Sequence, residues 1–286
     1  MFMLKIKTDE VEKIIQDVAD SIIVPRFQHP ENQEIHFKSE DNPVTIADKE
    51  AEKALKERLS ALLPGSKVVG EEEFEDNPAI IQRFLSESPV WIVDPLDGTK
   101  QFIAGEPLYG VIVALAQGDQ TVAGWLYDPT SREFVTTELG AGTYHKGERQ
   151  KVIEPDDLPN MRGIIGYRIM CAYRDCEESD DARKPIFVPM NSACHDYASL
   201  VVGKEHFSRR TQQAHFHTWL QTCTPWDSSA GILAHTEAGG YTAHWNGDPF
   251  QPSHYGRGIL SAGSKESWEE IRNWISTFCC VEDEAA

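Results

Sequence analysis

The stretch VWIVDPLDGT, residues 90–99, carries the pattern that decides the fold: a compact apolar strand followed by two aspartates and a glycine. We expect the strand to end at Val93. The proline after Asp94 keeps the backbone out of a helix, so Asp94 and Asp97 should project from one rigid turn. Gly98 allows a ligand to approach the backbone closely. The segment therefore predicts a strand end that presents two carboxylates to one site.

Two further segments place acids where a strand ends or a helix begins. Glu71 lies in GEEE, directly after the short strand 67–69, and Asp227 lies in WDSSAG, which opens a helix. In open α/β sheets, ligands collect beyond the carboxyl ends of the strands. Carboxylates gathered there repel one another unless protons or cations sit among them. Hard divalent cations take oxygen ligands, so the three segments predict a Mg²⁺ site, with the Leu96 carbonyl as a further ligand.

Each segment also has a simpler interpretation when it is taken alone. A run of glutamates is usually a solvated surface, and D-x-x-D-G-T alone is equally consistent with a turn and a helix cap. Asp227 alone would more often be an ordinary helix N-cap that accepts a hydrogen bond from the backbone of Ser229 or Ala230. The presence of all three segments, in this order, favours a functional site.

The composition is that of a globular protein. Among 286 residues, 40% are hydrophobic and 26% are charged, which excludes a collagen, a disordered chain and a coiled coil. The net charge of −19 should repel phosphate backbones and anionic lipid, so we expect no nucleic-acid and no membrane partner. Six cysteines without a C-x-x-C pair, an N-terminus that becomes charged early and the lack of a long apolar run favour the cytoplasm.

Hydrophobic periodicity predicts helices over 9–24, 48–63, 79–86, 196–203, 228–238 and 266–278, and strands over 67–69, 90–93, 109–116, 121–127 and 133–138. Turn signals between the strands after residue 109 predict an antiparallel meander. The polar stretch 155–189 is the candidate domain boundary. We expect an α/β protein of alternating helical and sheet layers, with an N-terminal α+β half over 1–155, a C-terminal α/β half over 156–286 and the site between them.

The three acidic segments GEE, DPLDGT and WDSSAG, in this order, resemble the signature segments of the inositol monophosphatase family of metal-dependent, lithium-sensitive phosphatases. PVTIAD (residues 43–48), GWLYDP (124–129) and EAGG (237–240) resemble three further elements of that family. The similarity covers about four-fifths of the chain. It implies the sugar-phosphatase type of α/β fold, a layered sandwich that alternates as αβαβα, and a homodimer.

The resemblance also implies a set of metal ligands. Glu71, Asp94 and the Leu96 carbonyl would hold one Mg²⁺, while Asp94, Asp97 and Asp227 would hold a second. Glu71 would share a looser third ion. Two metals bridged by one carboxylate are the usual arrangement for in-line phosphoryl displacement.

Catalytic and substrate-binding roles are transferred in the same way. Thr99, with Glu71, would orient a water for attack on phosphorus, and Asp48 would hold the Thr99 hydroxyl. The backbone N–H groups of Gly98 and Thr99, beside Asp97, would position the phosphate. The resemblance thus implies Glu71, Thr99 and Asp48 as catalytic residues.

The substrate side of the chain departs from the family. Ser192 and Ala193 match a small-residue segment that faces the substrate, and they are the candidate contacts. Leu220 stands where inositol-hydrolysing members carry a glutamate that contacts the ring. This difference weakens the expectation that inositol 1-phosphate itself is the substrate.

Four basic side chains of this half have no assigned role: Arg209, Arg210, His215 and His217. The arginine pair could bind a second phosphate, although paired surface arginines are usually solvated. The two histidines lack a third His or Cys at a suitable spacing, so pocket lining or surface is the expected place for them. His195 adjoins Asp196, but no G-x-S-x-G nucleophile elbow accompanies it, and we therefore expect no catalytic pair there.

The sequence predicts a Mg²⁺-dependent phosphomonoesterase that acts on a small phosphorylated metabolite and is inhibited by Li⁺. Candidate substrates are inositol phosphates, fructose 1,6-bisphosphate or another sugar bisphosphate, histidinol phosphate and 3′-phosphoadenosine 5′-phosphate. One alternative is a member that keeps the fold and serves as a binding or regulatory protein. Another is an aspartyl-nucleophile phosphatase, whose D-x-D-G-T signature is one residue shorter. The complete set of acids favours the metal-dependent enzyme.

Overall fold

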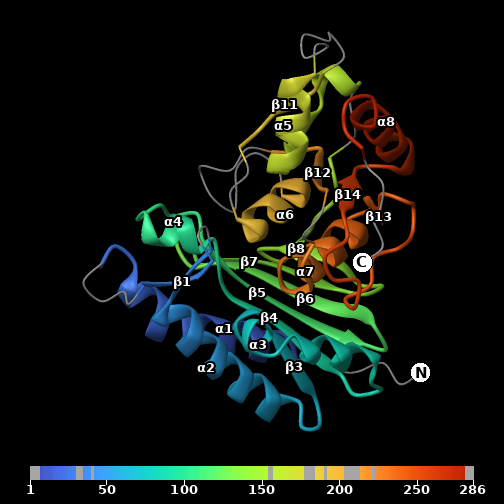
Figure 1. Cartoon of the computed structure of the whole chain (residues 1–286). Coiled ribbons are helices and arrows are strands. Elements are labelled where there is room, and N and C mark those ends of the chain that lie inside the picture. Colours follow the sequence, from blue (N-terminus) through green and yellow to red (C-terminus); the bar gives the residue numbers. More distant parts are fainter. Residues whose placement is uncertain are drawn as a thin grey trace.

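The computed structural model describes residues 7–29, 35–39, 42–153, 157–176, 184–189, 192–202, 213–220 and 223–280. They form five layers: helices, a seven-stranded sheet, helices, a five-stranded sheet, and helices (Figure 1). The predicted αβαβα sandwich is therefore confirmed.

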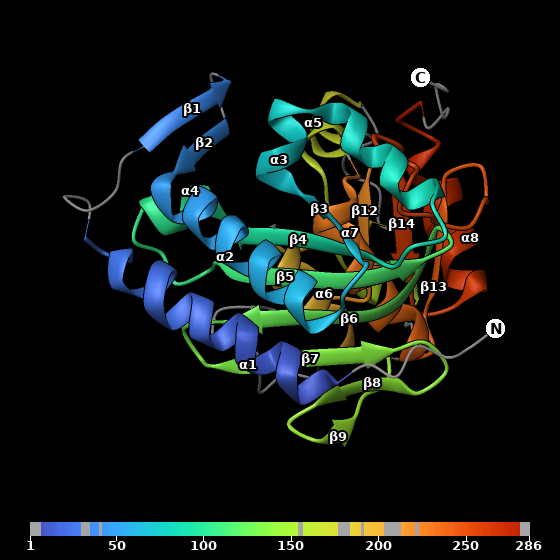
Figure 2. The same cartoon turned by 90° about the horizontal axis from the view of Figure 1, so that it is seen from below.

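The first layer lies on one face of the seven-stranded sheet (Figure 2). It consists of α1 (Thr8–Val18), a π-helical turn over Ala19–Ile23, a 3₁₀ turn over Val24–Arg26, and α2 (Ile46–Leu62). The hairpin of β1 (Ile35–Ser39) and β2 (Asn42–Thr45) leads into α2. Val11, Ile15 and Val18 on α1 are fully buried, as the helical spacing of apolar residues predicts.

The large sheet has the order β3-β4-β5-β6-β7-β8-β9. Its strands are β3 (Lys67–Gly70), β4 (Val90–Asp97), β5 (Gly110–Gln117), β6 (Gln120–Asp128), β7 (Glu133–Glu138), β8 (Gly142–His145) and β9 (Glu148–Arg149). β3 and β4 are parallel, and every later neighbour is antiparallel, which confirms the predicted meander. Between β3 and β4 the chain forms α3 (Glu71–Asp76) and a 3₁₀ helix over Pro78–Leu85, and α4 (Thr99–Ile103) follows β4.

The second sheet has the order β11-β10-β12-β14-β13. Its strands are β10 (Arg162–Ile165), β11 (Ile186–Phe187), β12 (Phe216–Trp219), β13 (Tyr241–His244) and β14 (Ile259–Ala262). A 3₁₀ turn over Leu158–Asn160 precedes β10. The outer layer contains α5 (Tyr167–Asp175) and α8 (Lys265–Ile275), and the central layer contains α6 (Ala193–Val201) and α7 (Pro225–Glu237) (Figure 1).

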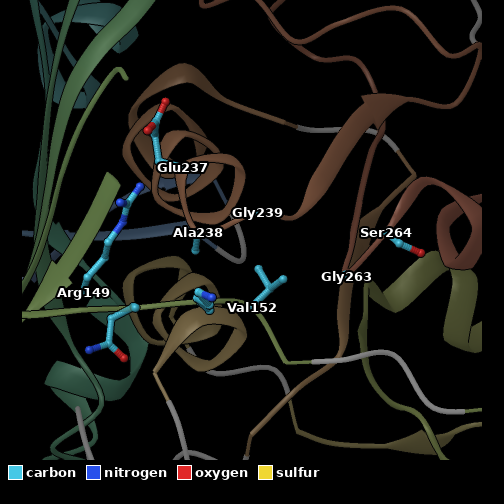
Figure 3. Close-up of a pocket in the computed structure, with 9 residues that line it drawn as sticks. Arg149, Val152, Glu237, Ala238, Gly239, Gly263 and Ser264 are labelled. Atoms are coloured by element: carbon cyan, nitrogen blue, oxygen red, sulfur yellow. The ribbon is translucent and has the colours of Figure 1, made fainter. Parts of the chain in front are cut away.

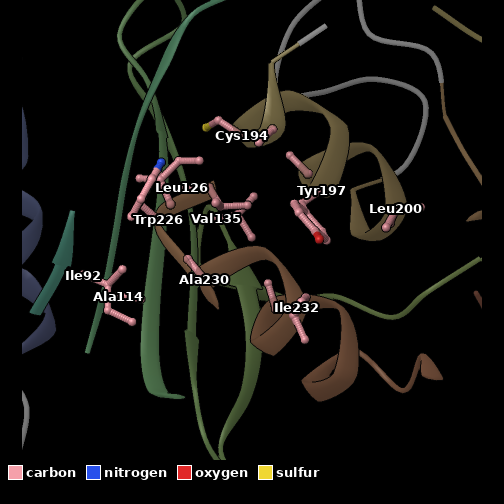
Figure 4. Close-up of a cluster of buried hydrophobic side chains, with 14 of the residues drawn as sticks. Ile92, Ala114, Leu126, Val135, Cys194, Tyr197, Leu200, Trp226, Ala230 and Ile232 are labelled. Atoms are coloured by element: carbon pink, nitrogen blue, oxygen red, sulfur yellow. The ribbon is translucent and has the colours of Figure 1, made fainter. Parts of the chain in front are cut away.

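The central layer joins the two sheets through an apolar core. Figure 4 shows Cys194 and Tyr197 of α6, and Ala230 and Ile232 of α7, beside strands of the large sheet. A Cβ atom on Gly124 of β6 would lie 2.8 Å from Cα of Ala230, so only glycine permits this close approach of α7. This packing holds α6 and α7 against the large sheet.

Several local expectations differ from the structure. The segment expected as a helix over 79–86 is 3₁₀ helix, and the strand expected to end at Val93 continues to Asp97. Part of the polar stretch 155–189 forms β10, α5 and β11, which the sequence did not predict. These strands have two to four residues, too few to display a period. The division near residue 155 stays a prediction.

Candidate metal centre

Two aspartates of β4 reach the same site because the strand is irregular between them. Asp94 pairs with Ile112 of β5, and Asp97 pairs with Gly110. Between these pairs, Pro95 and Leu96 of β4 lie opposite the single residue Val111 of β5, which is a β-bulge. In a regular strand, positions three apart point to opposite faces, and the extra residue cancels this alternation. Pro95 fits here because a bulge leaves an N–H unpaired.

Asp227 comes from the first turn of α7. The N-cap of this helix is Thr224, whose Oγ1 accepts from Asp227 N at 3.3 Å and donates to Asp227 Oδ2 at 2.6 Å. The interpretation of Asp227 as the N-cap is therefore wrong. Pro225 occupies the first helical position, where proline is favoured, so the helix begins three residues before the expected start.

Asp94, Asp97 and Asp227 each place one carboxylate oxygen within 4.8 Å of the others. Burial raises the pKa of Asp94 well above its usual range, and the charges of Glu71, Asp97 and Asp227 raise it further. Burial also raises the pKa of Asp97 to about 6, with the charge of Asp227 acting in the same direction. A divalent cation relieves such repulsion, and an all-oxygen donor set matches Mg²⁺.

Glu71 is the first residue of α3 and directly follows β3. Glu71 is not one of the three aspartates whose oxygens lie within 4.8 Å of one another. Its charge nevertheless raises the pKa of Asp94, so the two carboxylates lie near each other. Glu52 of α2 fixes the turn that carries Glu71: its carboxylate accepts from Glu72 N at 2.6 Å and from Glu73 N at 2.9 Å. These bonds satisfy two orphan donors of α3.

Thr99, Asp48 and Leu96 form a local hydrogen-bonded group. Thr99 Oγ1 lies 3.1 Å from Asp48 Oδ1 and 3.0 Å from the Leu96 carbonyl oxygen. Asp48 Oδ2 accepts from Thr45 N at 2.7 Å, which completes the capping box of α2. Gly98 precedes Thr99 with a left-handed φ of 83°, and α4 begins directly after it.

The first turn of α6 holds Asp97. Ala193 N donates to Asp97 Oδ1 at 3.1 Å, and Cys194 N donates to Asp97 Oδ2 at 2.7 Å. Ser192 is the N-cap of this helix and is buried. The structure thus places Ser192 and Ala193 beside Asp97; contact with a substrate stays a prediction for both.

The remaining basic candidates lie elsewhere. Arg209 and Arg210 lie outside the described residues. His215 Nδ1 accepts from Arg162 N at 2.8 Å, at the start of β10, so it pairs a backbone group of the second sheet. His217 is fully buried against Tyr197, which corrects the expectation of pocket lining or surface.

Sequence analysis missed Tyr255, which lies in the loop between β13 and β14. Its ring centroid is 4.8 Å from that of Phe74 on α3 and 5.9 Å from that of Trp226 on α7. Burial raises the pKa of Tyr255, and so do carboxylates that include Asp227 and Glu71. Tyr255 is 45% exposed, and its ring packs on the two helices that carry Glu71 and Asp227. No local signal marks a loop tyrosine, because only the tertiary fold brings it to these helices.

A cavity of about 680 Å³ lies away from the acids. Arg149, Lys151, Glu237 and Ser264 are among its lining residues, and Figure 3 shows it near the C-terminal end of α7. Asp227 lies in the first turn of that helix, about 15 Å away along its axis at 1.5 Å per residue. The cavity is therefore separate from the candidate metal centre.

The sequence model of the inositol monophosphatase family matches residues 5–276. The chain belongs to this family. An inositol-1-monophosphatase of Mesorhizobium japonicum is 30% identical over 260 residues, which cover 86% of this chain and 85% of that protein.

A further sequence relative agrees with the family assignment, and a solved structure shares the fold. A fructose-1,6-bisphosphatase/inositol-1-monophosphatase of Aquifex aeolicus is 29% identical, and the match covers 84% of this chain and 86% of the relative. The crystal structure of the extragenic suppressor protein suhB from Bartonella henselae superposes with a TM-score of 0.76 at 21% identity, covering 95% of this chain and 99% of that one. The names of the relatives indicate a phosphatase. None of the helices in the described part of the family member has the length and apolar character of a membrane span.

Proposed function

We propose that this protein hydrolyses a small phosphomonoester in a Mg²⁺-dependent reaction. The observation that carries the proposal is the convergence of Asp94, Asp97 and Asp227 within 4.8 Å, from a bulged strand and from the first turn of a helix. Such a cluster is costly without a cation, because burial and mutual repulsion both disfavour the ionised form.

Five residues would hold the cations: Glu71, Asp94, Leu96, Asp97 and Asp227. When bound, the cations supply Lewis acidity toward the phosphate and lower the pKa of a coordinated water. The chain's own contribution is rigidity. Two backbone N–H groups of α6 fix Asp97, and the Thr224 hydroxyl fixes Asp227. The ligands are therefore oriented before a cation arrives.

Thr99 and Asp48 would act on the attacking water together with Glu71. The Asp48 carboxylate accepts the Thr99 hydroxyl proton, which leaves the lone pairs of Thr99 Oγ1 available to a water's hydrogen. The left-handed backbone at Gly98 turns the chain so that the N–H groups of Gly98 and Thr99 begin α4, where phosphate oxygens can be bound.

Several organic groups are compatible with the substrate side of the site. Leu220 packs against the apolar core of the second sheet and offers no donor to an inositol ring. Tyr255 is half-exposed instead, and its ring packs on Phe74 and Trp226, which belong to the helices that carry Glu71 and Asp227. A sugar bisphosphate, histidinol phosphate or 3′-phosphoadenosine 5′-phosphate is therefore proposed beside an inositol phosphate. We further propose that the protein forms a homodimer in the cytoplasm. It would bind neither nucleic acid nor a membrane.

The decisive experiment measures phosphate release from a panel of these esters, with Mg²⁺, without it, and with added Li⁺. We expect Mg²⁺-dependent release that Li⁺ inhibits. Release from no ester, together with a protein partner recovered at defined stoichiometry, would favour the binding or regulatory role instead. An acid-stable phosphate adduct on Asp94 would favour the aspartyl-nucleophile mechanism.

A further inference from the structure

Three buried side chains form a line behind Asp97. His195 on α6 places Nδ1 2.7 Å from Ser192 Oγ, and its Nε2 lies 3.7 Å from Asp128 Oδ2 at the end of β6. His195 and Asp128 are fully buried, and Ser192 is 3% exposed. Nδ1 is therefore within hydrogen-bond distance of Ser192, whereas Nε2 faces the Asp128 carboxylate at ion-pair distance only.

The Asp128 carboxylate has hydrogen-bond donors besides His195. Asp128 already accepts from Thr130 N at 2.8 Å, from Thr130 Oγ1 at 2.6 Å and from Ser131 Oγ at 2.8 Å, so its local turn satisfies it. Burying an ionisable ring costs desolvation free energy, so buried positions are more often occupied by apolar side chains. A buried polar residue kept next to a candidate ligand therefore points to a role in the site.

The line ends at the turn that holds Asp97. Ser192 is the N-cap of α6, and its Oγ accepts from His195 N at 3.4 Å in addition to its contact with the ring. The next two N–H groups, those of Ala193 and Cys194, bind the two oxygens of Asp97. A change in the Ser192 rotamer or in the pitch of this turn would therefore move both donors to Asp97.

We infer that His195 is a positioning residue, which uses Asp128 as an anchor and Ser192 as the contact to hold the first turn of α6, and through it Asp97, in the orientation that binds a divalent cation. The inference rests on the proposed function, because it assumes that Asp97 is a metal ligand. Partners that orient metal ligands typically change metal affinity or activity by about 10- to 100-fold when they are removed.

The test measures Mg²⁺ binding directly, by isothermal titration calorimetry of the full chain without substrate. We expect His195→Leu to weaken Mg²⁺ binding by about 10- to 100-fold. The variant leaves the buried Asp128 carboxylate without its histidine partner, so it should also melt at a lower temperature, and the titration is run well below that temperature. His195→Asn keeps a polar atom at the Nδ1 position, next to Ser192, and should recover most of the affinity. His195→Gln extends past Ser192 toward Asp128 and should recover less.

The seven-stranded sheet, which contains both β4 and β6, also offers a control histidine. His145 on β8 is a second buried histidine with a carboxylate partner, Glu133, at 2.9 Å, and three strands separate β8 from β4. His145→Leu removes a buried histidine from a carboxylate that Lys146 also contacts at 2.5 Å, and it should leave Mg²⁺ affinity unchanged.

Distinct results separate this inference from the proposed function. Wild-type affinity in His195→Leu, equal weakening in His145→Leu, or equal affinities in the Asn and Gln variants would each overturn the positioning role. If the leucine variant does not fold, the comparison of Asn with Gln decides alone. A wild-type protein that binds no Mg²⁺ would remove the proposed metal centre itself, and the positioning role with it.

Discussion

The Thr99 hydroxyl and the Asp48 carboxylate, 51 positions apart in the sequence, lie 3.1 Å apart in the structure. The same hydroxyl is 3.0 Å from the Leu96 carbonyl oxygen, and it has one proton for these two acceptors. A cation that engages the Leu96 carbonyl would leave Asp48 as the acceptor. The capping box of α2 is thus tied to the start of α4, on either side of the candidate metal centre.

We predict that Thr99→Val lowers kcat by about 10²- to 10⁴-fold, the usual contribution of a positioned proton-transfer group. Valine keeps the shape of threonine and removes the hydroxyl, so the fold should survive. Thr99→Ser retains the hydroxyl and should recover much of the rate. Steady-state kinetics at saturating Mg²⁺, with circular dichroism of each variant, provide the measurement; a valine variant with wild-type turnover contradicts the assignment.

Asp94→Asn should lose Mg²⁺-dependent phosphatase activity by several orders of magnitude and still fold. The asparagine removes one charge from a buried, mutually repelling group, so the metal-free variant should melt at the same or a higher temperature than the wild type. Addition of Mg²⁺ should raise the melting temperature of the wild type and leave that of the variant nearly unchanged. Asp175→Asn, at an exposed position, serves as the control.

Gly98→Ala should destabilise the protein more than Gly247→Ala does. Both glycines have left-handed backbones, with φ of 83° and 91°, so each substitution carries a strain of roughly 1–2 kcal/mol. A Cβ atom on Gly98 would also lie 2.7 Å from the Leu108 carbonyl oxygen, whereas one on Gly247 meets no atom within 4 Å. The difference between the two variants in the free energy of unfolding, measured in urea, gives the cost of the contact with Leu108. Equal losses of stability would show that this contact costs nothing.

The predictable part of the site consists of residues that lie within short motifs. Asp94, Asp97 and Gly98 follow one another along the chain, and the proline between the two acids already indicates an irregular backbone. Their convergence with Asp227 could be predicted because strand ends and helix starts meet at one edge of a sheet. The αβαβα order followed from the resemblance rather than from periodicity.

The unpredicted part depends on contacts between distant segments. His195 and Asp128 belong to different elements, and only the packing of α6 on β6 brings them together. Tyr255 reaches Phe74 and Trp226 from a loop that has no periodic pattern. The short strands β10 to β14 each bury only a few residues, so sheet pairing rather than local preference determines them.

Tyr255→Ala should raise KM for a phosphoester with a planar, aromatic leaving group by about tenfold, because stacking on one aromatic ring contributes roughly 1–3 kcal/mol. The KM for glycerol 2-phosphate should hardly change, since that leaving group cannot stack. Tyr255→Phe keeps the ring and should behave as the wild type. Tyr167→Ala, at an exposed tyrosine of the outer layer, is the matched control. Equal changes for both substrates would show that Tyr255 shapes the fold and does not select the leaving group.

Glu52 should make the metal-free protein less stable as the pH rises from about 4.5 to 7. Burial raises its pKa from 4.5 to about 7, against the opposing effect of its bonds from Glu72 N and Glu73 N. The folded state therefore retains a proton that the unfolded chain releases over this window, and the free energy of unfolding falls as pH increases. The contribution is complete below pH 4.5 and lost above about pH 7.

Glu52→Gln removes this titration and keeps an amide of similar shape. The difference in melting temperature, variant minus wild type, should therefore be more positive at pH 8 than at pH 5, in buffer with a chelator to exclude cations. Glu57→Gln, an exposed position on the same helix, should show no such change with pH. A pH-independent difference for Glu52→Gln would mean that the carboxyl is already ionised in the folded protein at pH 5, stabilised by the two N–H groups of α3.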